Sequence, residues 1–154
     1  MSQTVVRTLT MSLDTNAYAN GDVIAATQEL PLAVKVEDGW GMIESLTVID
    51  NDDQGQVFDV WVMDSNVAMG TENSAPNISD PDAVSILGRI PVAAADYVDL
   101  GGSKVASLKN IGLPIKPANG STSIYVAIVN GTGTPTFTAA GIKLRFGIVQ
   151  GLSL

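Results

Sequence analysis

Hydrophobic and polar residues alternate along much of the chain. Near the N-terminus, Leu9, Met11 and Leu13 alternate with threonine and serine. Residues 142–150 place apolar side chains at the even positions from 142 to 148 and two basic side chains between them. Successive side chains of a β-strand point to opposite faces, so a period of two residues indicates a strand with one buried face. Both segments are therefore predicted to be half-buried strands.

Turn sequences separate further segments of this kind. Asn-Gly pairs at 20–21 and 119–120 supply the positive φ that tight turns need. Pro31 is expected in an edge strand or at a strand start, because it has no N–H to donate. The remaining predicted strands are residues 23–26, 30–36, 42–50, 57–63, 89–92, 105–108, 111–116 and 123–129. About eight to ten short antiparallel strands predict an all-β fold, a β-sandwich or jelly roll, as a single domain over residues 1–154.

The acidic loop DNDDQGQ at residues 50–56 lies between two predicted strands, and we expect it to join them as a hairpin. Its spacing resembles the start of a calcium-binding loop, with Asp50, Asp52 and Gly55 at suitable positions. The twelfth position, which requires a bidentate glutamate, is occupied by Trp61. We therefore predict a solvated turn and no bound metal.

The next two segments differ sharply in polarity. Residues 57–63 are apolar on both faces apart from Asp59, which indicates a strand in the middle of the sandwich or beneath another subunit. Residues 64–79 form a long polar segment without periodicity. Loops of this length are usually functional or mobile, so we expect the segment to contribute to binding.

Residues 80–87 carry the helix signal of the chain. Ser79 or Asp80 can cap the N-terminus, Pro81 suits the first turn, and Gly88 can end the helix. The residues between are mainly apolar, so we predict a short helix that plugs one side of the core.

Composition removes most catalytic chemistry from consideration. The chain has no cysteine, hence no disulfide and no thiolate ligand. It has no histidine, which is the commonest general base, the commonest transition-metal ligand and the usual partner of a catalytic serine. Carboxylate pairs remain possible, but nothing distinguishes a pair among the 16 acidic residues. We expect a protein that is not an enzyme and has no cofactor.

Charge and hydropathy also restrict the partners. A net charge of −8 disfavours nucleic acid, which proteins bind by neutralising phosphates. The first residues lack the basic and apolar regions of a secretion signal. No uncharged apolar run reaches the roughly 18 residues of a membrane-spanning helix. We therefore expect neither nucleic acid nor membrane as a partner.

The charges are distributed unevenly along the sequence. All 16 acidic residues lie between Asp14 and Asp99, and five of the eight basic residues follow position 100. One interpretation is that a β fold interleaves distant strands until the charges mix. The other is a surface with one acidic and one basic region, suited to head-to-tail contact with copies of the chain or with a neighbour. The sequence leaves both open.

Several segments resemble a family of small virion proteins of tailed bacteriophages. The resemblance is carried by NAYANGDVI (16–24), ISDPDAVSILGRI (78–90), DYVDLGGSKVASLKNIGLPIK (96–116) and SIYVAIVNGTGTPTFTAAGIKLRFGIVQ (123–150). It consists of turns and strands rather than a catalytic signature, and it implies a structural role in the virion. Small acidic all-β proteins of this kind are often head decoration (cement) proteins, which form trimers at pseudo-threefold points of the capsid.

The leading hypothesis is thus a capsid decoration protein on the outer surface of the virion, assembled in the cytoplasm of the bacterial host. Its expected partners are the major capsid protein and itself, as a trimer. Residues 1–15 are expected to form an N-terminal strand or arm that contacts a neighbouring subunit. The predicted partner-contact residues are Val5, Leu9, Met11, Leu13, Trp40, Met69 and Tyr97.

The alternative hypothesis is another virion component, in the tail, neck or head fibre, that contacts the host surface or carbohydrate. Trp40 lies between two glycines, where it is expected either at a binding surface or as a lid over one end of the sandwich. Carbohydrate recognition would require Trp40, Trp61 and Tyr97 to converge.

Overall fold

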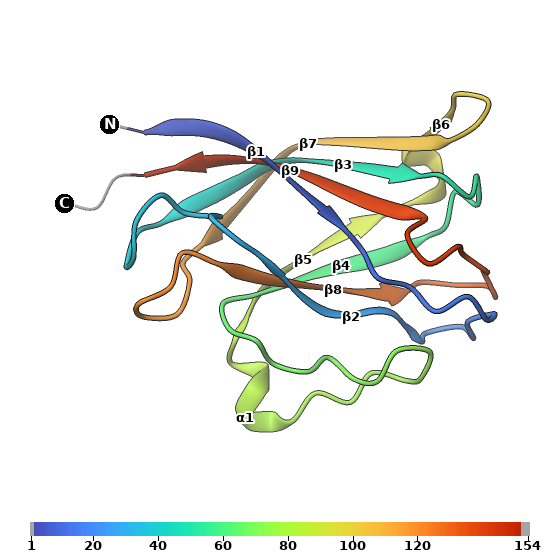
Figure 1. Ribbon diagram of the computed structural model, residues 1–154, viewed down its shortest axis with the longest axis horizontal. Coiled ribbons are helices and arrows are strands. Elements are labelled where there is room, and N and C mark those ends of the chain that lie inside the picture. The colour runs from blue at the N-terminus through green and yellow to red at the C-terminus, as the bar shows by residue number, and fades with distance from the viewer. Residues whose placement is uncertain (1, 152–154) are drawn as a thin grey trace.

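The computed structural model describes residues 2–151, which form two packed antiparallel β-sheets (Figure 1). The five-stranded sheet has the order β1-β9-β3-β7-β6 and the four-stranded sheet has the order β2-β8-β4-β5. The strands are β1 (Gln3–Thr10), β2 (Val23–Leu30), β3 (Gly41–Asp50), β4 (Phe58–Met63), β5 (Ile86–Val92), β6 (Tyr97–Asp99), β7 (Lys104–Ile115), β8 (Ile124–Asn130) and β9 (Ile142–Gln150). A helix α1 (Asp80–Ala83) and a 3₁₀ turn η1 (Ala94–Asp96) complete the fold.

The strand pairs are nested along the sequence. β1 pairs with β9, β2 with β8, β3 with β7, and β4 with β5, all antiparallel. Successive pairs fall alternately in the two sheets, which is the double-sheet arrangement of a jelly roll. The predicted all-β fold is therefore confirmed, and nine strands fall within the predicted range.

The core lies between the inner faces of the two sheets. The even positions of β9 from Ile142 to Ile148 are fully buried, as their alternation predicts. β3 supplies Leu46 and Val48 beside them, and β4 faces them from the other sheet with Val60. Burying an apolar side chain of this size contributes on the order of 2 kcal/mol, so this layer stabilises the sandwich.

Strand boundaries differ from the prediction at several places. Residues 23–30 form one strand, and residues 31–36 form turns after it, so Pro31 lies outside the strands. β7 is likewise continuous across residues 104–115, where two fragments were predicted. It contains Asn110 and Gly112 at positive φ, opposite an irregularity in β3, and this local distortion interrupts the alternation on which the prediction relied. β6 was not predicted.

The hairpin predicted around residues 50–56 is wrong. β3 pairs with β7 and β9 in one sheet, whereas β4 pairs with β5 and β8 in the other. The acidic loop therefore crosses between the sheets. Both strands carry apolar residues that must reach the same core from opposite sides, and a tight hairpin would have placed them in one sheet. Residues 57–63 were expected in the middle of the sandwich or beneath another subunit, and β4 is an internal strand between β8 and β5.

The helix is shorter than predicted and does not plug the core. Ser79 caps α1 by accepting a hydrogen bond from the Asp82 N–H at 3.3 Å, as its position indicated. The helix ends at Ala83, none of its residues is buried, and Val84 after it is 83% exposed. Ile86 starts β5 instead, where it pairs with Met63.

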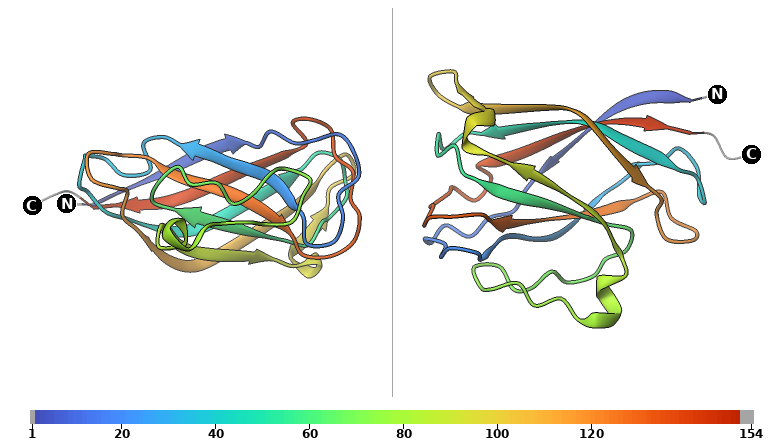
Figure 2. Two further views of the ribbon diagram at one scale, coloured as in Figure 1. Left: turned by 90° about the horizontal axis from the view of Figure 1, so that it is seen from below. Right: turned by 180° about the vertical axis from the view of Figure 1, so that it is seen from behind.

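The two sheets differ in what covers their outer faces. The segment 64–79 runs across the outer face of the four-stranded sheet, with α1 at its end (Figures 1 and 2). Met69 from this segment packs on Val23, Met63 and Ala127 as a second small apolar cluster. No comparable segment lies on the five-stranded sheet in the part of the chain described (Figure 2). The outer face of the four-stranded sheet is thus partly covered, whereas the outer face of the five-stranded sheet is bare in the part of the chain described.

Candidate interaction surfaces

The carboxylates of the acidic loop are used to hold its own backbone. Asp50 is 1% exposed, and its side chain accepts hydrogen bonds from the N–H groups of Asp52 (2.9 Å) and Gly55 (2.7 Å). Asp52 in turn accepts bonds from the N–H and hydroxyl of Thr138. Burial raises the pKa of Asp50, although its hydrogen bonds with loop N–H groups act in the opposite direction. These bonds give the loop a structural role as the crossing between sheets.

Two further features bear on the expected chemistry. Within residues 2–151, no three acidic side chains lie close enough together to share a metal ion. No helix in this part of the chain is both long and apolar enough to cross a bilayer.

Three of the predicted contact residues are buried in the chain's own core. Met11 is 0%, Leu13 5% and Met69 4% exposed. The expectation that these three contact a partner is corrected, because their side chains already complete the two apolar clusters of the sandwich. Periodicity identified Met11 and Leu13 as apolar-facing, but it could not distinguish a core from an intersubunit contact.

The other four predicted contact residues are at least partly accessible. Val5 and Leu9 are half-buried on the inward side of β1. Tyr97 is half-buried, donates its hydroxyl to the Gln56 carbonyl at 2.8 Å, and has a pKa raised by burial. Trp40 is 47% exposed, and its ring lies over Gly151. The Trp40 carbonyl accepts a hydrogen bond from the Gly151 N–H at 3.0 Å. Whether these residues contact a partner stays a prediction.

The structure does not bring the three aromatic residues together. Tyr97 pairs with Ala106 of β7, and Ala106 pairs with Val48 of β3. Trp40 comes just before the first residue of β3. Tyr97 is therefore level with Val48, eight residues along β3 from Trp40, which corresponds to roughly 25 Å. Trp61 belongs to the other sheet and lines a groove on its outer face. Convergence, the condition for a carbohydrate-binding aromatic cluster, is therefore not met.

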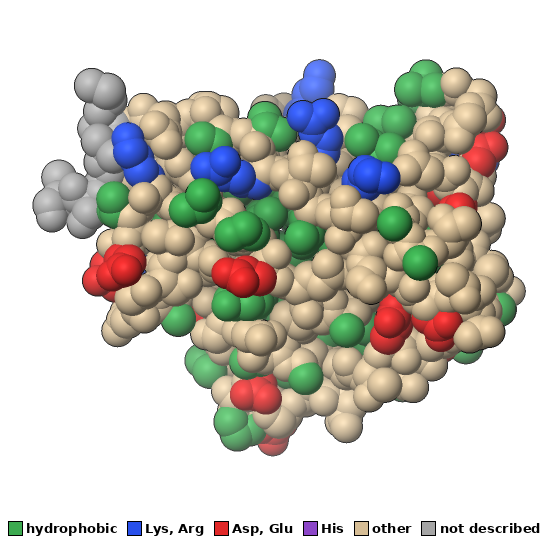
Figure 3. Space-filling view, in the orientation of Figure 1, with side chains coloured by type: hydrophobic (Ala, Val, Ile, Leu, Met, Phe, Trp, Pro, Cys, Tyr) green, Lys and Arg blue, Asp and Glu red, His purple; other side chains and the backbone are tan. Residues whose placement is uncertain are grey.

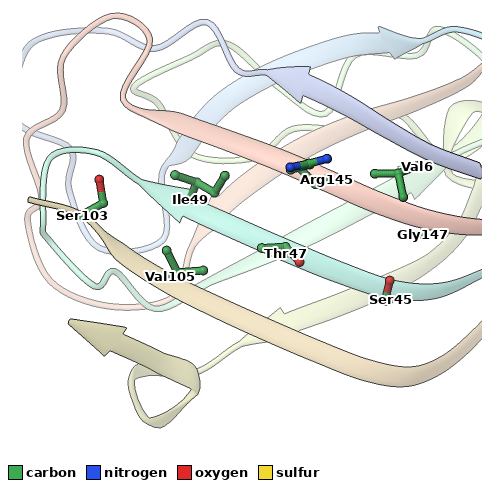
Figure 4. Close-up of a pocket in the computed structure, with 8 residues that line it drawn as sticks. All are labelled: Val6, Ser45, Thr47, Ile49, Ser103, Val105, Arg145 and Gly147. Atoms are coloured by element: carbon green, nitrogen blue, oxygen red, sulfur yellow. The ribbon is translucent and has the colours of Figure 1, made fainter. Parts of the chain in front are cut away.

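A hollow lies on the bare outer face of the five-stranded sheet (Figure 4). It has a volume of about 490 Å³ and crosses β1, β9, β3 and β7. It is lined by Val6, Ser45, Thr47, Ile49, Ser103, Val105, Arg145 and Gly147. The lining combines hydroxyl groups and short apolar side chains around one guanidinium group, and it contains no carboxylate.

Small side chains at the centre of the sheet create this groove. Gly147 of β9 pairs with Ser45 of β3, and a Cβ at Gly147 would collide with the Ser45 hydroxyl. Arg145 lies in the next row, opposite Thr47. Larger side chains in place of Gly147, Ser45 and Thr47 would fill the hollow, so the small residues keep the groove open.

The outer face of this sheet is also cationic. Lys109, Lys143 and Arg145 point outward from β7 and β9, as the pairings Ser45–Lys109, Ile49–Lys143 and Thr47–Arg145 place them on the side of the groove. Figure 3 shows Lys and Arg side chains gathered over the five-stranded sheet, with Asp and Glu mainly below and towards one end. Five of the eight basic residues lie in strands of this sheet, against three of the 16 acidic residues, Glu44, Asp50 and Asp99. The fold therefore separates the charges rather than mixing them.

These basic side chains form no ion pair with another described residue. Across residues 2–151 there is one ion pair, between Arg89 and Asp59 at 3.4 Å, and it lies on the four-stranded sheet. The cations of the bare face are therefore available to an external anionic group. We call Lys109, Lys143, Arg145 and the groove beside them the cationic face.

A second, smaller groove lies on the four-stranded sheet where the 64–79 segment stops covering it. Its volume is about 250 Å³, and it is lined by Asp59, Trp61, Met69, Pro76, Ile78, Ile86 and Val129. Its only acidic residue, Asp59, already pairs with Arg89. The groove is an apolar seam between the sheet and its covering segment.

Comparisons with known proteins found weak structural similarity to proteins of viruses. No protein-family model and no curated protein matches it. VP2 of infectious bursal disease virus, from a subviral particle, is 13% identical over 96% of this chain, with a TM-score of 0.39. The chain spans only 32% of that protein. Desmodium yellow mottle tymovirus is 10% identical over 100% of this chain and 85% of its own, with a TM-score of 0.30. Turnip yellow mosaic virus is 11% identical over 100% and 97%, with a TM-score of 0.31. With TM-scores below 0.5 and identities below 25%, this likeness carries no conclusion about the function of the chain.

Proposed function

We propose that this protein is a non-enzymatic structural component of a virion, and specifically a decoration protein that braces major capsid protein subunits on the outside of a phage head. The observation that most supports this function is the cationic face, a bare surface whose basic side chains form no ion pair among the described residues, on a molecule with a net charge of −8. The segments that resemble tailed-phage virion proteins, between residues 16 and 150, point in the same direction.

The charge separation suits a ring of identical subunits. In a threefold ring each subunit contacts the next through two different patches, so the patches must be complementary rather than identical. A chain with five of its eight basic residues on one sheet and most of its carboxylates elsewhere offers such a pair. We propose that the protein trimerises and that the remaining exposed cationic side chains dock on an acidic part of the shell. Repetition of a modest contact three times per trimer then strengthens binding through avidity.

Binding to expanded, empty heads of the same phage tests this function. The informative change is Lys109→Glu on the cationic face, and the matched control is Lys35→Glu, an exposed lysine in the loop before β3. We expect Lys109→Glu to weaken head binding by at least about tenfold, equivalent to ~1.4 kcal/mol, and Lys35→Glu to change it little. Raising the salt concentration should weaken binding of the unmodified protein, because exposed charges are screened.

Two outcomes contradict the proposal. A chain that sediments as a monomer and does not bind heads is not a decoration protein. Equal binding of the two lysine variants would show that the cationic face does not contact the shell. The alternative tail, neck or head-fibre component with carbohydrate contact has no supporting observation here, because the aromatic residues it requires lie on different parts of the molecule.

A further inference from the structure

The four edges of the two sheets are not equally protected against pairing. β2 carries two irregularities in its register, β5 carries Pro91, Gly88 and an irregularity, and β6 has only three residues. Bulges, prolines and short length are the usual devices that block an edge. β1 has none of them, since it runs for eight residues in unbroken register with β9 (Figure 2). It is the edge best suited to accept another strand.

The hydrogen-bonding phase of β1 shows which of its residues face outward along the edge. The Met11 N–H donates to the Ile142 carbonyl at 3.0 Å, and the two residues continue the register of β1 with β9. Because such bonds fall on alternate residues, the odd positions of β1 point their N–H and C=O groups at β9. The even positions Thr4, Val6, Thr8 and Thr10 point theirs away from the sheet.

One end of this edge is already satisfied within the chain. The Gln28 side chain accepts from the Ser12 N–H at 2.7 Å and donates to the Thr10 carbonyl at 3.2 Å, so that its amide acts as a peptide group of a neighbouring strand. The outward-facing peptide groups of Thr4, Val6 and Thr8 have no hydrogen-bond partner among residues 2–151, and all three side chains are exposed, Val6 by 54%. The site that remains is therefore a stretch of three outward-facing residues.

We propose that this edge pairs with the β1 edge of a second copy, antiparallel about a twofold axis centred on Val6. In that register Val6 faces Val6 and Thr4 faces Thr8, so the three open residues of each copy meet those of the other in mutually hydrogen-bonded pairs. On the inner face Arg7 falls opposite Val5, so no like charges are directly opposed. The pairing joins two five-stranded sheets into one and makes their cationic faces continuous, since Val6 lines the groove.

This contact is independent of the head-binding function and of the threefold ring. It would equally link two rings, because identical patches meet across a twofold axis. Its small size indicates a weak contact in dilute solution, and the test therefore traps it covalently rather than relying on a stable dimer.

The absence of cysteine in the sequence makes single-cysteine variants informative. Residues facing each other in a hydrogen-bonded pair have Cα atoms about 5.5 Å apart, within the range of a disulfide. We expect Val6→Cys to form an intermolecular disulfide under mild oxidation at least about tenfold faster than Val84→Cys, a control that is 83% exposed but away from the edge. Thr4→Cys alone should not cross-link above that control, whereas a mixture of Thr4→Cys and Thr8→Cys should.

A backbone variant separates pairing from folding. Val6→Pro removes an N–H that points away from β9, so the fold should survive, and it should reduce cross-linking of the Thr4→Cys and Thr8→Cys mixture to the control level. Val6→Cys that cross-links no faster than Val84→Cys overturns the proposal. So does a Thr4→Cys variant that cross-links with itself as fast as the mixture, because that requires another register. Cross-linking of Val6→Cys only to a different protein in the particle would also overturn it, in favour of a foreign strand at this edge.

Discussion

The outer faces of the two sheets differ in whether another segment of the chain covers them. The four-stranded sheet is covered by residues 64–79, whose Met69 closes a second apolar cluster over Met63 and Ala127. The five-stranded sheet has no such cover and instead presents serine, threonine, glycine and three cations around an open groove. A sandwich needs only one apolar face per sheet to form its core. The covered face therefore adds stability, and the bare face is available for partners.

Hydrogen bonds that hold residues 64–79 in place support a stabilising role for the covered face. Glu72 accepts a hydrogen bond from the Asp14 N–H at 2.6 Å, and Asn73 donates to the Asp14 carboxylate at 2.9 Å. The bond from the Asn73 side chain is the main reason that the pKa of Asp14 is lowered. Tyr18, buried in the main core, donates to Glu72 as well, at 3.1 Å. Residues 72–73 of the segment are thus hydrogen-bonded to the connection between β1 and β2, and these bonds hold the segment in place.

The largest effect is expected where the two sheets meet. Phe146→Ala removes a fully buried ring from β9 and should lower the free energy of unfolding by about 3–5 kcal/mol. Arg145→Ala, on the opposite face of the same strand, should change it by less than about 0.5 kcal/mol. Urea unfolding of both variants checks the contrast. Similar losses in the two variants would show that the bare face also carries stability.

The covering segment should contribute a smaller but substantial amount. Met69→Ala opens the second cluster and is expected to cost about 2–4 kcal/mol in urea unfolding. Asn66→Ala, an exposed position in the same segment, should be nearly neutral. If Met69→Ala were as mild as Asn66→Ala, the segment would be a loosely held loop and the two outer faces would not differ in kind.

A substitution in the acidic loop that crosses between the sheets should change the free energy of unfolding by a smaller amount, and this change should depend on pH. Asp50→Asn leaves one loop N–H without its acceptor and should cost about 1–2 kcal/mol. Because burial raises the pKa of Asp50 in the folded protein, the native state holds this proton more tightly than the unfolded state. The contribution of Asp50 to the free energy of unfolding is therefore greatest below pH 3.8, and it declines as the pH rises through the raised pKa of the folded protein.

Urea titrations of the wild type and Asp50→Asn across that pH range test the sign. The difference in unfolding free energy between them should narrow as the pH increases from below 3.8 towards neutrality. A difference that widens instead would mean that the ionised carboxylate is favoured by its hydrogen bonds, and that burial does not dominate.

The smallest expected effect is on the cationic face. Lys109→Glu should shift the free energy of unfolding by less than about 0.5 kcal/mol, because the side chain is exposed and makes no ion pair with another described residue. Thermal unfolding measured beside Lys35→Glu checks this. A strong destabilisation would make the loss of head binding by the same variant a consequence of unfolding rather than of surface charge.

Sequence periodicity predicted the parts of the fold that depend on one strand at a time. The inward residues of β9, the central position of β4 and the Ser79 cap are each local consequences of alternation or capping chemistry. Pairing between strands was not predictable in the same way, because alternation determines which face is buried and not which strand lies beside it. The supposed β3–β4 hairpin failed for this reason.

The candidate surfaces required the fold. Ser45 and Gly147 are neighbours only because β3 pairs with β9, so no local pattern revealed the groove. The uneven charge along the sequence was visible, but two interpretations were open until β7 and β9 were found in one sheet with their cations on one side. Met69 lay in a segment without periodicity, and its burial depends on how that segment crosses the four-stranded sheet.

The proposed function assigns partner binding to the bare face of the five-stranded sheet. An electron cryomicroscopy reconstruction of assembled particles tests it most directly, at a resolution that places the two sheets. We expect copies distributed over the whole head, with Lys109, Lys143 and Arg145 turned towards the shell or a neighbouring subunit. Copies confined to the tail, or copies on the head with this face turned to solvent, would contradict it.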